Sequence, residues 1–224
     1  MPEFSPAVVT VDARHRRAMY KAGRQRDTER TSFVGPDDAF LRSLDLAMRI
    51  ERATGEELSR VEELTLRTSQ MNATGVHYSD ATLRGLLGDP RHEVLVATLT
   101  DRFGPHGAIG VVLLEKHRSM WHLKLLATSC RVMSFGAGAV ILNWLVDQAA
   151  RAGVHLTADF RPTGRNRIME VAYRFAGFTG EECRCLATAL TGESDRGDIQ
   201  RLHLRPAPQP APATMSLVAP DLST

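Results

Sequence analysis

The feature that most constrains this fold is a run of three strand-like segments followed by a long apolar helix and a further strand. The three segments are residues 93–100, 108–116 and 119–128. Apolar residues then recur at helical spacing over residues 137–152, and a short strand follows at 155–160. An antiparallel meander that leads into a crossover helix and a parallel strand predicts an α+β fold in three layers, with a mixed central sheet and helices on both faces.

The flanking segments extend this pattern. A strand at residues 47–52 precedes two helices, which begin near Thr54 and at Ser79. Thr54 has Glu57 three residues on, as in a capping box, and Ser79 is a good helix cap. After the strand at 155–160 the sequence predicts a helix at 167–175 and a final strand at 182–189.

The chain divides into four predicted parts. We expect a flexible N-terminus, a basic helical linker, one domain, and a tail rich in proline and alanine that is disordered. Their ranges are residues 1–12, 13–45, 46–203 and 204–224.

The overall charge argues against nucleic acid as the main partner, because a net charge of +2 is too small. The charge is nevertheless uneven, since seven basic residues and two acidic ones lie between Arg14 and Arg30. Such a run is either a solvated helix face or a docking surface for an acidic partner.

Three cysteines give no disulfide framework. On a strand, Cys183 and Cys185 would place both thiols on one face, which suits a zinc site poorly, so we expect no metal. No secretory signal is visible, and the best apolar run, 137–146, is interrupted by Asn143 and too short to span a membrane. The simplest expected location is the cytoplasm, with no membrane partner.

The first informative motif lies between the strand at 119–128 and the long helix. Small residues at such a turn let backbone N–H groups and the helix N-terminus face one point, which favours phosphate binding. A tight turn alone would also use small residues. The spacing Arg131-x-x-Ser134-x-Gly136 resembles the acyl-CoA pyrophosphate loop of GNAT proteins, Arg/Gln-x-x-Gly-x-Gly/Ala, with Ser134 in place of the first glycine.

The second motif follows the strand at 155–160. Asn166, Tyr173 and Gly177-Phe178 resemble the GNAT closing motif in order and spacing. The resemblance implies that the Tyr173 hydroxyl protonates the departing thiolate, and that Asn166 binds the pantetheine arm or its loop. The alternative is that Tyr173 packs against the sheet and Asn166 caps a helix.

Together the motifs imply a thioester substrate, coenzyme A or phosphopantetheine, whose arm lies between the strands 123–128 and 155–160. A backbone N–H near residues 126–128 would hold the acyl carbonyl. The residues expected at the cofactor site are Leu126, Ala127, Thr128, Arg131, Val132, Met133, Ser134, Phe135, Gly136, Ala137, Gly138 and Asn166.

Three longer stretches, residues 60–79, 101–111 and 129–133, resemble the C-terminal GNAT-like half of FkbH-like proteins. Those proteins load glyceryl units onto acyl carrier proteins in polyketide pathways. The Asp-x-Asp-x-Thr/Val motif of their phosphatase-like half does not occur in this sequence. The resemblance implies an acyltransferase acting on acyl-CoA or an acyl carrier protein; the alternatives are a non-catalytic carrier-protein-binding module or a decarboxylating loader.

Several side chains are candidates for the chemistry itself. Cys130, beside Arg131 and near a helix N-terminus, could be a nucleophile, although direct transfer needs none and a small buried residue explains it equally well. The candidates for acceptor binding are Arg67, Gln70, Asn72, Thr74 and His122. The candidates for a base are His77, His117, His122 and Glu115.

Overall fold

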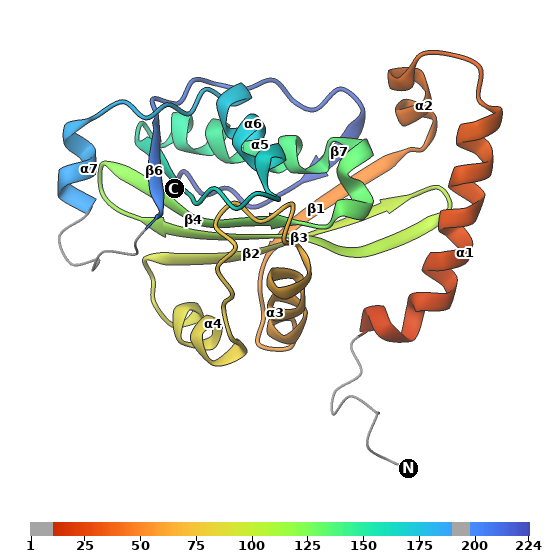
Figure 1. The fold of residues 1–224 in the computed structure, drawn as a ribbon, viewed down its shortest axis with the longest axis horizontal. Helices are drawn as coiled ribbons and strands as arrows, with labels where there is room; N and C mark the ends of the chain where they lie inside the picture. Colours follow the sequence, from red (N-terminus) through yellow and green to blue (C-terminus); the bar gives the residue numbers. More distant parts are fainter. Residues whose placement is uncertain (1–10, 190–197) are drawn as a thin grey trace, which may run out of the picture.

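The computed structural model describes residues 11–189 and 198–224, without the side chains of residues 11–17, 67 and 187–189. Seven of its segments form one mixed sheet. The strands are β1 (Leu46–Arg52), β2 (His92–Asp101), β3 (Gly104–Lys116), β4 (Met120–Thr128), β5 (His155–Phe160), β6 (Gln200–Leu204) and β7 (Met215–Val218). Their order across the sheet is β6-β5-β4-β3-β2-β1-β7 (Figure 1).

The predicted meander is present, since β1 to β4 pair with their neighbours in antiparallel fashion. The long helix α5 (Ala137–Arg151) then crosses over, and β5 pairs with β4 in parallel. β6 is antiparallel to β5, and β7 is parallel to β1. The predicted α+β class with a mixed central sheet is therefore confirmed.

Helices cover both faces of the sheet (Figure 1). The helices α5 and α6 (Arg167–Phe175) lie on one face, and α3 (Leu58–Arg67) and α4 (Asp80–Leu87) lie on the other. Each face has its own apolar core, to which α5 contributes Leu142 and Leu145, and α3 contributes Leu58 and Val61. Burial of these amphipathic faces stabilises the two helix layers.

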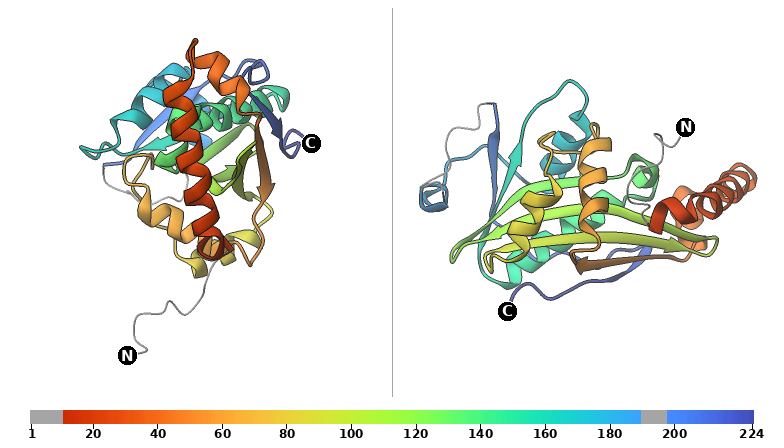
Figure 2. Two further views of the ribbon diagram at one scale, coloured as in Figure 1. Left: turned by 90° about the vertical axis from the view of Figure 1, so that its right-hand side faces the viewer. Right: turned by 90° about the horizontal axis from the view of Figure 1, so that it is seen from below.

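The ends of the sheet carry further helices. The helix α1 (Val11–Ser32) and the short α2 (Asp37–Ser43) lie at one end, as both views of Figure 2 show for α1. The short helix α7 (Arg184–Ala189) lies beside the edge strand β6 (Figure 1). A 3-10 helix, η1 (Cys130–Phe135), joins β4 to α5. No helix in the described ranges is long and apolar enough to cross a membrane.

The predicted helix ends agree in part with the structure. Ser79 caps α4, and its side chain accepts a hydrogen bond from the N–H of Thr82. Gly153 follows α5 with a φ of 66°, the left-handed geometry that a glycine adopts without strain. Thr54 is not the cap of α3, because its N–H and hydroxyl bind the carboxylate of Glu57 and the helix begins only at Leu58.

The strand predicted at residues 182–189 is wrong. Residues 184–189 form α7, and the strand beside β5 is β6. A short segment of mixed side chains fits both the helical and the strand period of hydrophobicity, so tertiary packing decides which structure forms. β6 gains its position because Leu202 is buried in the main core, with the partly buried Leu204 packed against it.

The tail predicted to be disordered, 204–224, is instead ordered. β7 adds a parallel strand to β1, and Leu222 is only 1% exposed. Leu222 donates its N–H to Gln148 Oε1 at 2.8 Å and accepts from Lys116 Nζ at 2.7 Å. Proline favours extended chain, and apolar residues between the prolines bury against the sheet. At the other end, residues 1–10 of the predicted flexible N-terminus lie outside the described residues, and residues 11–12 belong to α1.

Candidate functional site

β4 and β5 run side by side only at their beginnings. Their parallel pairing joins residues 120–123 to residues 155–158, and both strands continue beyond it. Lys124 forms a bulge on β4, because Leu113 and Leu114 of β3 pair with Leu125 and Leu123. A bulge bends a strand, so the far end of β4 diverges from β5 and leaves a split between residues 126–128 and Phe160.

A segment of the chain itself, residues 71–73, fills this split. Ala73 donates its N–H to the carbonyl of Leu126 at 3.2 Å, and Thr128 donates its N–H to the carbonyl of Met71 at 2.9 Å. On the other side, Arg161 donates its N–H to the carbonyl of Ala73 at 3.0 Å. The segment therefore bonds to the polar backbone of β4 and to the chain just after β5.

Asn166 fastens this segment from behind and is 1% exposed. Its Nδ2 lies within 3.0 to 3.1 Å of the carbonyl oxygens of Asn72, Ala73 and Arg161. Its Oδ1 accepts the N–H of Thr163 at 2.9 Å, so the side chain does not cap α6. Asn166 thus joins the segment in the split to the loop after β5.

Two candidates for acceptor binding shape the same loop. Asn72 Oδ1 accepts the N–H groups of Thr74 and Gly75 at 3.1 and 2.9 Å. Asn72 and Thr74 are each 1% exposed. Gln70 is exposed and lines a small cavity of about 90 Å³ with Cys130. Arg67 is the last residue of α3, and its side chain lies outside the described residues.

The predicted phosphate loop forms a tight turn. Ser129 caps η1 and accepts the N–H of Arg131, and Gly136 ends η1 with a φ of 69° before α5 begins. Val132 and Ala137 are buried, whereas Arg131, Met133 and Ser134 are exposed. A Cβ on Gly138 would lie 3.6 Å from Thr128 Oγ1, which is buried without a hydrogen-bond partner among the described residues.

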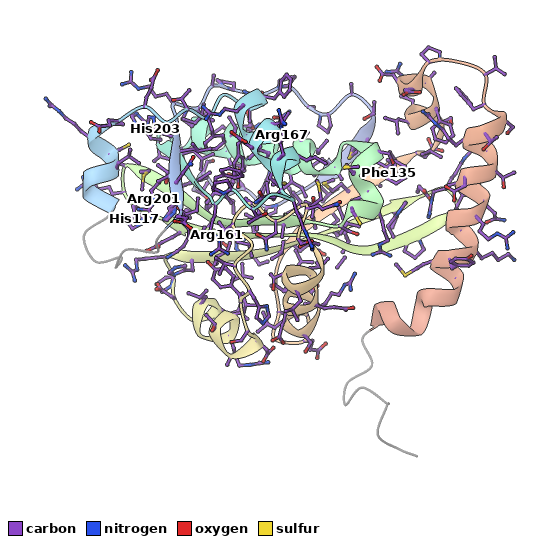
Figure 3. The ribbon with its side chains drawn as sticks, viewed as in Figure 1. His117, Phe135, Arg161, Arg167, Arg201 and His203 are labelled. Atoms are coloured by element: carbon purple, nitrogen blue, oxygen red, sulfur yellow. The ribbon has the colours of Figure 1, made fainter. Side chains whose placement is uncertain are left out.

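A pocket of about 1030 Å³ opens between η1 and the helices α1, α2 and α3. Figure 3 shows Phe135 of η1 toward the end of the molecule that α1 occupies. Five arginines and three carboxylates line it. The arginines are Arg24, Arg26, Arg30, Arg60 and Arg131, and the carboxylates are Asp27, Asp37 and Glu63. Arg26, Arg30 and Arg60 form ion pairs with Asp101, Asp37 and Glu63, so the charge offered to an anionic ligand comes mainly from Arg24 and Arg131. Tyr20 and Phe40 add aromatic surface.

α1 is fixed to the sheet by a buried carboxylate. Asp101, at the end of β2, forms an ion pair with Arg26 and lies 3.0 Å from His106 Nε2. Burial raises the pKa of Asp101, but the hydrogen bonds from His106 and Arg26 outweigh it and lower that pKa to about 2. The basic helix is therefore a wall of the pocket as well as a solvated surface.

A buried polar network lies where β4 and β5 begin to diverge. His122 Nε2 is 2.8 Å from Asp159 Oδ1, and the same oxygen accepts from Arg201 Nε at 3.1 Å. His122 and Asp159 are both 2% exposed. Sequence reasoning missed Asp159 and Arg201, although Asp159 is the only carboxylate in β5 and is followed by Phe160.

No protein-family model matches this sequence, and no curated protein does. Solved structures do match. Ard1 from Thermoplasma volcanium has a TM-score of 0.51 at 14% identity, over 70% of this chain and 97% of that one. A domain from Methanocaldococcus jannaschii reaches 0.54 at 10% identity, over 71% and 99%. A putative acetyltransferase of the GNAT family from Desulfovibrio desulfuricans reaches 0.50 at 15% identity, over 71% and 98%.

The chain has the GNAT fold. The three structures cover the sheet-and-helix domain at low identity, so the likeness concerns the fold. The link to FkbH-like proteins rests on the sequence motifs alone. What the site of this GNAT fold can do follows from its own side chains.

In this GNAT fold, Tyr173 belongs to the core. It is 0% exposed, its hydroxyl has no hydrogen-bond partner among the described residues, and its ring packs against Phe160 and Phe178. Burial, and then the charge of Asp159, raise the pKa of the hydroxyl far above its usual value. The structure matches the packing alternative, and the hydroxyl does not line the arginine-rich pocket.

Of the remaining candidates, Cys130 lines the arginine-rich pocket, and Glu115, His117 and His77 do not. Cys130 is exposed and lines it, so the thiol is accessible rather than a buried strand residue. Glu115 binds Lys124 at 2.9 Å; burial raises its pKa, but Lys124 lowers it further, so it stays a carboxylate. His117 lies 3.5 Å from Glu115, and His77 lies 3.5 Å from Glu62 on α3.

Proposed function

We propose that this chain is an acyltransferase that takes an acyl group from a coenzyme A or carrier-protein thioester. The observation that carries the proposal is the arginine-lined pocket that opens onto η1. Arg131 and the turn it begins would bind the phosphates, since guanidinium groups and backbone N–H groups both suit phosphate oxygens. The aromatic residues of the pocket would contact the adenine of coenzyme A. The GNAT fold of the solved neighbours supports the same assignment.

The acyl end would lie in the split, close to His122. This imidazole is held by Asp159, which fixes the ring as a base for the incoming acceptor. The backbone N–H of Thr128 would bind an amide of the pantetheine arm rather than the thioester carbonyl, since six strand residues, about 20 Å, separate it from His122.

Binding of the arm requires residues 71–73 to leave the split, because they now occupy the N–H of Thr128 and the carbonyl of Leu126. A pantetheine arm carries amide groups that can replace both bonds. The hydrogen bonds of residues 71–73 would then be exchanged for those of the arm, and the net free-energy cost of such an exchange is small.

A second candidate is a non-catalytic carrier-protein-binding module. Two observations favour it: residues 71–73 close the split to a thioester, and the buried hydroxyl of Tyr173 is not accessible as an acid. The basic α1 would then dock an acidic carrier protein. A setting in polyketide or hybrid peptide assembly follows only from the resemblance to FkbH-like proteins.

Calorimetry with three ligands separates these functions. The ligands are coenzyme A, adenosine 3′,5′-bisphosphate and a phosphopantetheinylated carrier protein. In a second experiment, mass spectrometry follows acetyl transfer from acetyl-CoA to a panel of acceptors. Coenzyme A that binds more tightly than the bisphosphate, together with thioester consumption, supports the acyltransferase. Carrier-protein binding without affinity for coenzyme A, and without any turnover, supports the module.

A further inference from the structure

Four potential metal ligands converge at the sheet edge farthest from α1. His155 begins β5, His203 lies on β6, Cys185 lies in α7, and Cys183 directly precedes that helix. Their ligand atoms all lie within 4.8 Å of one another. Figure 3 shows His203 on β6 beside α7. Three elements that are distant in sequence thus bring two imidazoles and two thiols to one point.

The contacts of this cluster are not those of ordinary hydrogen bonds. His155 Nδ1 lies 3.0 Å from His203 Nε2, 3.3 Å from Cys185 Sγ and 3.5 Å from Cys183 Sγ. A ring nitrogen carries either one proton or one lone pair, so it can make only one good hydrogen bond. With three groups around one such nitrogen, at most one of the three contacts is a good hydrogen bond.

A metal ion at the centre would satisfy all four groups at once. With Zn–S near 2.3 Å and Zn–N near 2.0 Å, tetrahedral ligand atoms lie roughly 3.3 to 3.8 Å apart. The separations of 3.0, 3.3 and 3.5 Å around His155 Nδ1 are close to those values. Two thiolates and two imidazoles are a ligand set that zinc prefers over hard cations.

We propose that His155, Cys183, Cys185 and His203 form a structural zinc site. Four protein ligands leave no open position for a substrate, which is typical of structural rather than catalytic zinc. The ion would fasten α7 and β6 to the beginning of β5. β6 also carries Arg201, the partner of Asp159, so the zinc would hold the outer strand that supports this network.

The proposed site differs from the expectation drawn from the Cys-x-Cys spacing. On a strand the two thiols would share a face with no other ligand nearby. In the structure Cys185 lies in the first turn of α7. The two histidines come from the neighbouring strands β5 and β6, 28 residues before Cys183 and 18 residues after Cys185. Only the tertiary fold brings the four together.

Metal content and thiol reactivity test the proposal on the unmodified full chain. We expect one tightly bound zinc ion per chain by elemental analysis. Of the three cysteines, only the exposed Cys130 should react rapidly with a thiol reagent, and all three should react after chelation. Chelation should also lower the melting temperature. Chain purified from zinc-supplemented cells that holds no zinc, with all three thiols equally reactive, would overturn the site.

Variants locate the ion. Cys183→Ser and His203→Gln should weaken zinc binding on the order of 100-fold or more, because each removes a direct ligand. Cys130→Ser and His117→Gln make the same chemical changes outside the cluster and should retain the ion. Cobalt in place of zinc should show thiolate charge-transfer absorption that Cys183→Ser weakens. Zinc that survives both ligand changes would contradict the assignment, and none of these readings depends on acyl transfer.

Discussion

The backbone N–H of Thr128 donates to the carbonyl of Met71 at 2.9 Å, across the place where β4 leaves β5. This bond closes the split with the chain's own backbone. Any ligand that enters there must take over the N–H of Thr128, and residues 71–73 must move aside. The residues that hold the segment therefore decide both the stability of the domain and the access to its split.

Asn166→Ala should destabilise the domain. The change removes the donor that the carbonyls of Asn72 and Arg161 share, whereas the carbonyl of Ala73 keeps the N–H of Arg161. A buried group without a partner costs about 1 to 3 kcal/mol. Urea unfolding measures the loss. Asn143→Ala, at an exposed position of α5, is the matched control and should change stability by less than about 0.5 kcal/mol. An Asn166→Ala chain as stable as the control would show that the clamp is unimportant.

His122→Gln should lower kcat in whichever transfer reaction is found. Loss of a positioned base typically costs about 10² to 10⁴ in rate. The affinity for coenzyme A should remain, because His122 does not line the arginine-rich pocket. Measurements of kcat and of coenzyme A affinity over a range of pH separate a loss of base catalysis from a loss of binding. Circular dichroism checks that the variant is folded. Unchanged kcat in a folded variant would remove His122 from the mechanism.

Tyr173→Phe should leave transfer within about twofold of the parent rate. The hydroxyl is buried without a described partner, so its removal should also keep or raise stability, by up to about 1 kcal/mol. Thermal unfolding and initial rates measure both. A rate loss on the order of 100-fold would instead support the acid role that the closing motif implies.

Asp101→Asn should loosen α1 from the sheet at neutral pH. The pKa of Asp101 is lowered to about 2 in the folded chain, and its value in an unfolded chain is about 3.9. A lowered folded pKa adds stability above pH 4, and this contribution is lost as the pH falls toward 2.

The difference in unfolding free energy between parent and Asp101→Asn should therefore be present at pH 7 and shrink between pH 4 and pH 2. Denaturant titrations across that range measure it. Asp80→Asn breaks the exposed pair with Arg84 and should cost less than about 1 kcal/mol at any pH. A stability difference between parent and Asp101→Asn that does not depend on pH would argue against the ion pair with Arg26.

The sequence predicted the central strands and α5 of the domain but not its two edge strands. The meander, α5 and β5 follow from apolar periodicity and from caps such as Ser79, which are local signals. β6 and β7 do not, because neither Leu202 nor Met215 lies in a clear local pattern and both strands depend on pairing with distant chain. The prolines of the tail indicated disorder, yet extended chain is what an added edge strand requires.

The site shows the same division. The motifs singled out Arg131 and Asn166; in the structure Arg131 lines the arginine-rich pocket, and Asn166 binds the segment that fills the split. The ion pair of Asp159 depends on Arg201 from β6, and the proposed zinc site depends on α7, so neither could be predicted from spacing along the sequence. The role of Tyr173 could not be predicted, because a tyrosine at this position of the motif can be either a packed core residue or a general acid.

Calorimetric titration of coenzyme A tests the proposed function most directly. The parent chain should bind it, and Arg24→Glu and Arg131→Glu should each weaken binding by at least about tenfold, since each reverses a charge that lines the pocket. Arg42→Glu makes the same change in net charge on the exposed surface of α2, outside the pocket, and should bind like the parent. No binding by the parent, or equal binding by all three variants, would contradict the pocket as the site of coenzyme A.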